Sequence, residues 1–237
     1  MQGPLSDAVL KITTVSVARA TDRDKGAARS LLHATFSRDA HPMCNKLLGY
    51  GNGHAECHET GASWSARELS DSAYLITVAA AHNRFAREDL ISAALLTVHG
   101  DRKGRLRQTM GSINWGSTSR GFIGPKGYMN IQMIGSRPDA RGRVHAGTKA
   151  VEAAFELAVV LGLTKVLCVG TPETMAFWEK RGLRPAQGQG HAAKEGVINL
   201  WSKEATVLEA QVAEWAGRSP TPSEAAETEA AEVEDGQ

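Results

Sequence analysis

The stretch RPDARGRVHAGTKAVEAAFELA, from Arg137 to Ala158, decides the architecture of this chain. A basic turn of mostly small residues, Arg141 to Ala146, leads directly into apolar residues at helical spacing. A helix N-terminus presents backbone N–H groups that lack intrahelical acceptors, and it carries a partial positive charge. Small residues let an anion approach that backbone, and two arginines add cationic donors. The turn therefore has the composition of a phosphate-binding helix start, although most such turns bind nothing.

The segments around this stretch alternate between strand and helix patterns. Strand patterns occur at 13–19, 72–80, 90–100, 128–135, 165–170 and 196–203. Helix patterns occur at 24–36, with Asp22 or Asp24 as its cap, at 43–48, at 145–161 and at 172–181. A strand–helix–strand run in the second half requires a parallel pair, whereas the first half reads as antiparallel. We therefore predict a mixed α/β sheet flanked by helices.

The length of 237 residues suits one large domain with appendages. We expect an N-terminal extension at 1–12, a domain at 13–203 with loop insertions at about 40–70 and 101–127, a C-terminal helix at 204–217 and a disordered acidic tail at 218–237. From residue 219 onward the tail has six acidic residues and no basic one, so the rest of the chain is mildly basic. A mildly basic chain favours anionic ligands in general. The sequence has no dense stripe of lysines and arginines with interleaved aromatic residues, which would indicate a nucleic-acid binder.

The sequence predicts an intracellular protein, cytoplasmic or nuclear. It has no apolar run near the roughly 20 residues that span a bilayer, and no secretory signal at its start. Its three cysteines are odd in number and far apart, which favours a reducing compartment. We expect no membrane association, and the oligomeric state stays open.

Residues 128–185 resemble the central part of the GNAT superfamily of acetyltransferases. In that family a strand leads to an Arg/Gln-x-x-Gly-x-Gly/Ala turn, and the turn at Arg141 matches it, except that Val144 replaces the first motif glycine. The close FWEKRG, at 177–182, also follows the family pattern. The weaker resemblance covers about 13–203 and is most similar to the acetyltransferase domains beside PHD fingers in plant-type chromatin proteins, although this chain has no PHD cysteine array.

The resemblance implies a GNAT-like fold, with a mixed, mostly antiparallel sheet and a central splayed pair of parallel strands. It also implies acetyl-CoA as co-substrate, with pantetheine along the strand before the turn and the pyrophosphate on the turn. The cofactor-binding positions that it implies are Met133, Ile134, Gly135, Ser136, Arg137, Arg141, Gly142, Arg143, Val144, His145, Ala146 and Thr171.

The catalytic positions of the family are both substituted in this chain. Many relatives have a glutamate base where this chain has Asn130, and a tyrosine acid where it has Trp178. An amide cannot take a proton at neutral pH, and an indole N–H donates a hydrogen bond without acting as an acid. The candidate substitute bases are His99, Glu88, Asp89, Tyr128 and His191, which the sequence alone does not rank.

Two functions follow from the resemblance. The first is an acyl-CoA-dependent N-acetyltransferase in which an amine attacks acetyl-CoA directly within a ternary complex. Its acceptor is a small-molecule amine, a protein N-terminus or a lysine, with a slight preference for protein lysine. The alternative is a catalytically weakened module that binds CoA or a protein partner.

A second cluster raises the question of zinc. His41, Cys44, His54, Cys57 and His58 are zinc-ligand types, but their spacing matches no common zinc motif. A polar loop over the substrate cleft explains them more simply. We therefore expect no metal, with this cluster as the alternative.

Overall fold

The computed structural model describes residues 9–50, 55–56, 63–64, 73–81, 89–99, 127–140, 145–186 and 206–218. The strands of its main sheet are β1 (Val9–Ser16), β4 (Ala73–Ala81), β5 (Asp89–His99), β6 (Tyr128–Ser136), β7 (Lys165–Gly170), β8 (Arg184–Pro185) and β9 (Thr206–Gln211). The helices are α1 (Asp22–Thr35), α2 (His41–Leu47), α5 (Ala146–Val160), α6 (Met175–Glu179) and α8 (Val212–Ala216). Two short strands, β2 (Ala55–Glu56) and β3 (Ser63–Trp64), pair separately.

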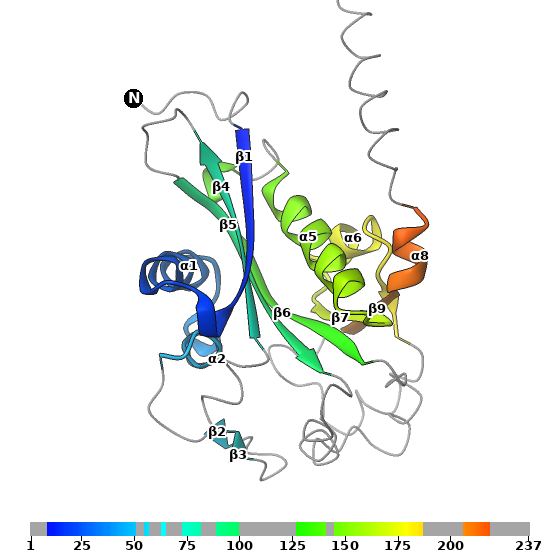
Figure 1. Ribbon diagram of the computed structural model, residues 1–237, viewed down its shortest axis with the longest axis horizontal. Helices are drawn as coiled ribbons and strands as arrows, with labels where there is room; N and C mark the ends of the chain where they lie inside the picture. The colour runs from blue at the N-terminus through cyan, green and yellow to red at the C-terminus, as the bar shows by residue number, and fades with distance from the viewer. Residues whose placement is uncertain are drawn as a thin grey trace, which may run out of the picture.

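In the part of the chain that the structure describes, the main sheet has seven strands in the order β1-β4-β5-β6-β7-β9-β8. Every neighbouring pair is antiparallel except β6 and β7. Figure 1 shows α1 and α2 on one side of the sheet and α5, α6 and α8 on the other. The predicted mixed, mostly antiparallel α/β sheet with one parallel pair is therefore confirmed.

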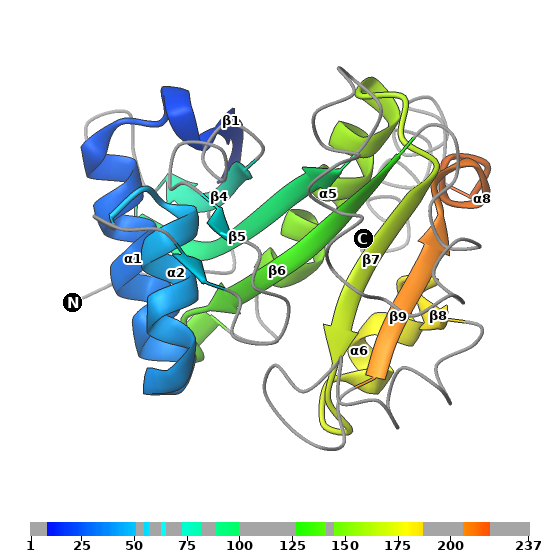
Figure 2. The same ribbon diagram turned by 90° about the horizontal axis from the view of Figure 1, so that it is seen from below.

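The parallel pair separates soon after it begins. Its register runs only from Tyr128 opposite Lys165 to Ile131 opposite Cys168, although both strands continue beyond these residues. Figure 2 shows β6 and β7 starting together and then spreading apart. On its other side β6 stays paired with β5 as far as Ser136. Among the residues that the structure describes, the second half of β6 thus has a sheet neighbour on one side only.

An extra residue in β6 changes which face its side chains occupy. Leu95 of β5 lies opposite Met133 and Leu96 opposite Ile131, so Gln132 is the additional residue of a bulge. Before the bulge, Ile131 packs with the core under α5. After it, Met133 packs with the core under α1 and α2, while Ile134 faces the α5 core.

The α5 face of the sheet is covered by small side chains. Ala146, Ala150, Ala154 and Ala158 are buried along α5, and Phe155 stacks on Trp215 with ring centroids 5.0 Å apart. Alanine favours the helix and lets its backbone lie close to the strands. The helix ends at Gly162, which has a φ of +66°, and this confirms the stop predicted there.

The opposite face is covered by α1 and α2. The side chain of Thr21 caps α1 by accepting a hydrogen bond from the backbone N–H of Asp24 at 3.1 Å. The expected cap at Asp22 or Asp24 is therefore wrong, because both lie inside the first turn. A β-carbon on Gly135 would lie 3.0 Å from Thr35 Oγ1, so only glycine lets the end of α1 come this close to β6.

Three predicted elements differ from the structure. The first strand is Val9–Ser16 rather than 13–19, because its pairing with β4 ends at Ser16 and a 3₁₀ turn follows. The short helix expected at 172–181 is confined to Met175–Glu179. The terminal helix expected at 204–217 is wrong in its first half, where β9 pairs with β7 over six residues and buries Val207 and Leu208. Sheet pairing there overrides a local helical pattern.

The sheet consequently extends past both ends of the expected domain at 13–203. Across the described residues, no helix is both long enough and apolar enough to cross a bilayer. The strand expected at 196–203, nearly all of the 101–127 insertion and the acidic tail lie outside the described residues.

Candidate functional site

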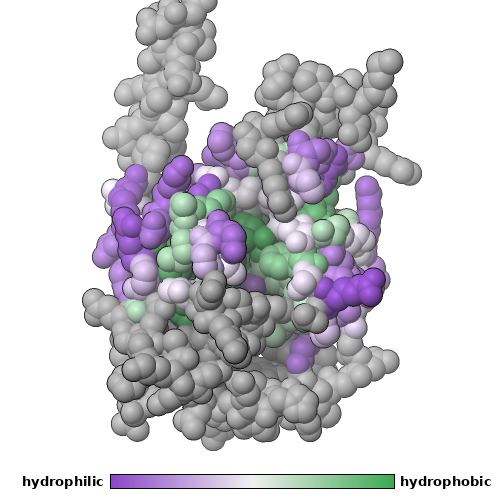
Figure 3. All heavy atoms as spheres, turned by 180° about the vertical axis from the view of Figure 1, so that it is seen from behind, coloured by the Kyte–Doolittle hydropathy of each residue, from purple (hydrophilic) through white to green (hydrophobic). Residues whose placement is uncertain are grey.

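A cleft of about 400 Å³ opens where β6 and β7 separate. Three elements form its walls: the end of β6, the first turn of α5, and α6 with the turn before it. Thr35, at the end of α1, also reaches it. The face seen in Figure 3 carries a hydrophobic hollow between hydrophilic flanks.

The first turn of α5 forms one wall of the cleft. Ala146, Gly147 and Thr148 line the cleft, and their N–H groups occupy the helix positions that have no intrahelical acceptor. The residue before them, His145, has a φ of 47° and makes no side-chain cap, and the first turn contains no acidic residue. This helix end therefore keeps its positive potential unneutralised by its own side chains.

Gly147 keeps this wall open. A β-carbon added there would lie 3.4 Å from Ser136 Oγ and 3.7 Å from Phe177 Cε2. A larger side chain at this position would therefore fill the space between β6, α5 and α6.

The second half of β6 forms another wall. Ile134, Gly135 and Ser136, three of the predicted cofactor-binding positions, line the cleft. Ser136 Oγ donates a hydrogen bond to Ser92 Oγ at 3.0 Å, and Ser92 Oγ donates to the Gly135 carbonyl at 2.9 Å. Met133 points to the other face and is buried under α1 and α2, so only its backbone is near the cleft.

The turn between β7 and α6 is held by its own hydrogen bonds. Thr171 N–H donates to Thr174 Oγ1 at 2.9 Å, and Thr174 Oγ1 donates to the Thr171 carbonyl at 3.1 Å. A hydrogen bond with Thr171 lowers the pKa of the exposed Glu173 carboxyl. Glu173 and Thr174 line the cleft, whereas Thr171, the residue singled out from the sequence, supports the turn without lining it.

Aromatic side chains of α6 cover the base of the cleft. Trp178 is buried and meets the Phe177 ring edge-on, with centroids 4.9 Å apart. Gly170, at the end of β7, leaves room for it, because a β-carbon there would lie 3.3 Å from Trp178 Cδ1 and 2.8 Å from Leu208 Cδ1. Trp178, the predicted position of the family acid, thus lines the cleft.

Arg181 is a cleft residue that the sequence reasoning missed. Its guanidinium lies 3.6 Å from the centroid of the Phe177 ring, and it donates to the Phe177 carbonyl at 2.6 Å and to Thr148 Oγ1. Burial lowers its pKa, and no carboxylate of the described residues forms a salt bridge with it. In the sequence, Arg181 directly precedes Gly182, the predicted stop after the short helix, and this position was the available signal for it.

Asn130 does not line this cleft. It lies opposite Thr97 in β5 and Leu167 in β7, two residues before the bulge. Gln132 donates to Thr97 Oγ1 at 2.9 Å, which links the bulge to the β5 residue opposite Asn130. Asn130 therefore belongs to the face opposite α5, while Trp178 lies in the α5 core.

The described substitute bases are poorly suited to that role. Burial raises the pKa of the Tyr128 hydroxyl far above neutrality, so it stays protonated. Asp89 lies at the far end of β5 from Thr97, the partner of Asn130. The His99 side chain and all of Glu88 and His191 lie outside what the structure describes.

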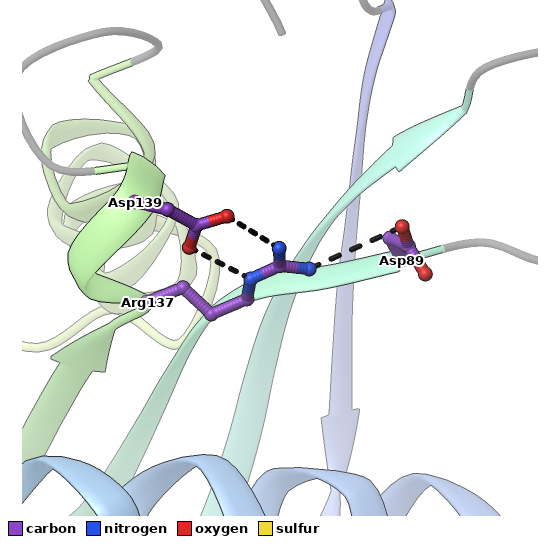
Figure 4. Close-up of polar contacts among 3 residues, drawn as sticks. All are labelled: Asp89, Arg137 and Asp139. Carbon is purple, nitrogen blue, oxygen red and sulfur yellow. Dashed lines mark hydrogen bonds and ion pairs between the residues drawn. The ribbon is translucent and has the colours of Figure 1, made fainter. Parts of the chain in front are cut away.

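Arg137 is held outside the cleft. Figure 4 shows its guanidinium against two carboxylates, with Nε and Nη2 donating to Asp139 at 3.0 and 2.5 Å and Nη1 lying 4.0 Å from Asp89. Both carboxylates raise the pKa of Arg137, and the hydrogen bond that Arg137 donates to Asp139 has the largest effect. Its side chain borders a smaller cavity of about 190 Å³ beside α1. Its predicted contact with a cofactor would thus involve the backbone.

The zinc alternative gains no geometric support from its described members. His41 Nε2 lies 3.1 Å from the His33 carbonyl, and burial raises the pKa of the Cys44 thiol to about 11. Within the described residues no group of three metal-ligating side chains comes together. His54, Cys57 and His58 lie outside those residues, as do Arg141, Gly142, Arg143 and Val144 of the predicted pyrophosphate turn.

Comparison with known proteins supports the fold. No protein-family model matches the sequence, and no curated protein matches it. Among solved structures, a Desulfovibrio desulfuricans protein assigned to the GNAT family of acetyltransferases is similar at 10% identity and a TM-score of 0.50, over 86% of this chain and 99% of that one.

Two further structures have the same TM-score of 0.50. One is the NatC complex bound to Gag peptide and CoA, at 10% identity over 84% of this chain and 95% of that one. The other is FeeM, an N-acyl amino acid synthase from uncultured soil microbes, at 11% identity over 90% and 96%. The chain therefore has the GNAT fold that the sequence resemblance predicted.

Proposed function

We propose that this protein is an acyl-CoA-dependent N-acyltransferase that binds acetyl-CoA in the cleft between β6 and β7. The observation that carries the proposal is the open first turn of α5 beside a strand that has lost its parallel neighbour. The α5 N–H groups are suited to the diphosphate, and the end of β6 offers an extended edge to the pantetheine arm.

The reaction is attack of a neutral amine on the thioester carbonyl. The C–N bond forms, the amine proton leaves to a base or to water, and the C–S bond breaks to release CoA. Asn130 can orient an attacking amine or a water but cannot take the proton. The Trp178 indole N–H is a hydrogen-bond donor that can stabilise developing charge near the cleft without acting as an acid.

Positioning supplies the catalysis that the missing acid and base do not. Holding two reactants in line can contribute several kcal/mol to the barrier reduction. We expect the amine to approach from the face of the sheet that carries Asn130, and the thioester from the α5 face. Asn130 lies before the bulge in β6 on the face opposite α5, whereas Ile134 lies after it and faces α5. Use of acetyl-CoA would fit the intracellular location expected from the sequence.

Calorimetric titration with acetyl-CoA and CoA tests binding, and thiol release over a panel of amines tests turnover. The panel includes amino acids, N-terminal peptides and lysine peptides, since proteins with this fold include one bound to a peptide and one that makes N-acyl amino acids. Saturable binding with thiol release on at least one amine is expected. Absence of binding by either ligand would overturn the proposal.

A non-catalytic CoA-binding module is the second candidate. It is favoured by the substitution of both family acid–base positions, Asn130 and Trp178. Binding of acetyl-CoA without thiol release on any amine would support it. The variant Asn130→Glu separates the two, because restoring a carboxylate should raise turnover of an enzyme and leave a pure binding module without turnover.

A further inference from the structure

Two serines face each other across β5 and β6 at the edge of the cleft. Ser92 and Ser136 are direct partners in the antiparallel register. Ser92 is fully buried, whereas Ser136 lines the cleft. Their hydroxyl oxygens are 3.0 Å apart, and Ser92 Oγ lies 2.9 Å from the Gly135 carbonyl oxygen.

The positions of the two hydroxyl protons follow from these contacts. A carbonyl oxygen only accepts, so the single proton of Ser92 is used in the bond to Gly135. The contact between the two serines must then use the proton of Ser136. Ser136 Oγ is left with lone pairs only, and it can accept a hydrogen bond from a ligand but cannot donate one.

The direction of the hydrogen bond from the Ser136 hydroxyl is fixed at a point in the cleft that a bound ligand would pass. Its oxygen lies 3.4 Å from the point where a β-carbon on Gly147 would be, between β6 and the first turn of α5. The described residues supply no donor to this oxygen. Because Ser92 is buried and has no solvent to exchange with, the pair cannot easily reverse its direction.

We propose that Ser92 is a positioning residue that makes Ser136 an acceptor-only site for an amide N–H of the bound ligand. This inference rests on the proposed function, since the pantetheine arm of CoA carries two secondary amides, each with one N–H. A ligand with a carbonyl or an ether oxygen at the same point would face the Ser136 lone pairs and be rejected. The pair thus discriminates ligands by the direction of a hydrogen bond.

The variants Ser136→Ala and Ser92→Ala test the proposal by calorimetry with CoA and with 3′,5′-ADP, which lacks the pantetheine arm. Ser136→Ala should weaken CoA binding about fivefold to tenfold. Ser92→Ala, which frees the Ser136 proton, should weaken it by about threefold. Neither should change the affinity for 3′,5′-ADP, and Ser92→Thr, which keeps the hydroxyl, should restore CoA binding.

CoA analogues methylated at each pantetheine amide nitrogen provide the second readout. The native protein should discriminate against one of the two analogues, and Ser136→Ala should lose most of that discrimination. Equal losses for CoA and 3′,5′-ADP would show a general structural effect and overturn the inference. Unchanged CoA binding in both alanine variants would also overturn it, while the proposed function would stand. Failure of the native protein to bind CoA would overturn both.

Discussion

The two long helices that the structure describes, α1 and α5, begin in opposite ways. The start of α1 is neutralised by its own side chains: Thr21 caps it, and Asp22 and Asp24 lie in its first turn. The start of α5 has no side-chain cap and no acidic residue, and it opens into the cleft. Both helices bury an apolar face, so the comparison concerns their ends.

This difference is consistent with the proposed binding of an anionic ligand at the start of α5. An anionic group near a helix N-terminus is stabilising, and α1 supplies that group from within the chain. At α5 the same stabilisation is left for an external anion, and Arg181, which bonds to Thr148, adds positive charge there. Comparable changes at the two helix starts should therefore have different consequences.

The largest effect is expected from a carboxylate placed at the open helix start. Gly147→Glu should weaken CoA binding by at least thirtyfold, about 2 kcal/mol, because its side chain fills the cleft and repels phosphate. Calorimetric titration measures this loss. The matched control is Gly26→Glu in α1, where a β-carbon meets only Tyr50 Oη at 3.8 Å, and CoA affinity should stay unchanged. Equal losses in both variants would contradict the assignment of the cleft.

A smaller but broader effect is expected from the link between α5 and α6. Arg181→Met removes the hydrogen bonds to Thr148 and to the Phe177 carbonyl, so it should lower the free energy of unfolding by about 1–3 kcal/mol. It should also weaken CoA binding by about tenfold, through lost positive charge beside α5. Urea unfolding and calorimetry measure the two effects. Arg181→Lys keeps the charge, so it should regain most of the CoA affinity but little of the free energy of unfolding. If the lysine variant does not regain CoA affinity, the positive charge at this position does not support binding.

The caps themselves distinguish the two helices by stability. Thr21→Ala should lower the free energy of unfolding by about 1 kcal/mol, since it removes the acceptor for Asp24 N–H. His145→Ala should change it by less than about 0.5 kcal/mol, because His145 makes no cap hydrogen bond. Thermal or urea unfolding of the two variants gives this comparison, and a larger loss at His145 would reverse it.

The smallest effect is expected in the pH dependence of the free energy of unfolding, through His33 of α1. The His33 ring stacks on the His41 ring, with centroids 3.8 Å apart. Burial lowers the pKa of His33, and the charges of His41 and Arg29 lower it further. A hydrogen bond with Asn45 opposes this shift. The unfolded chain then binds more protons than the folded one, so stability should be complete above about pH 7 and decline as the pH falls below the ordinary histidine pKa near 6.5.

His33→Gln should flatten this decline in unfolding experiments between about pH 7 and pH 5. His145→Gln, which replaces an exposed imidazole at α5, is the control and should leave the decline in place. An unchanged slope in His33→Gln would place the pH sensitivity elsewhere.

The sequence predicts the fold wherever local pattern and tertiary pairing agree. The strand at 165–170 and the helix up to Gly162 have the expected limits, because apolar periodicity and the glycine stop coincide with the packing. The sequence predicts helix at 206–211 because Val207, Leu208 and Val212 fit helical spacing. Pairing with β7, a strand much earlier in the chain, makes it a strand, and local sequence carries no record of that contact.

The candidate site was predictable to a similar extent. The resemblance directed attention to Gly135, Ser136 and Ala146, and these residues do line the cleft. It did not identify Arg181 or Ser92, whose roles depend on which strand or helix lies opposite. It also named Arg137, whose side chain is occupied by Asp139.

The bulge at Gln132 has a consequence for redesign of the protein. In a regular strand Asn130 and Ile134 would share one side, but the additional residue places them on opposite sides of the sheet. Deleting Gln132 itself would restore regular alternation and leave Met133, Ile134 and Ser136 on the sides that they occupy now. Deleting a residue between the bulge and Ser136, such as Gly135, would instead move Ser136 by one position and turn it towards α1. The wall of the cleft therefore depends on a count of residues as much as on their chemistry, and insertions or deletions in β6 should be less tolerated than substitutions.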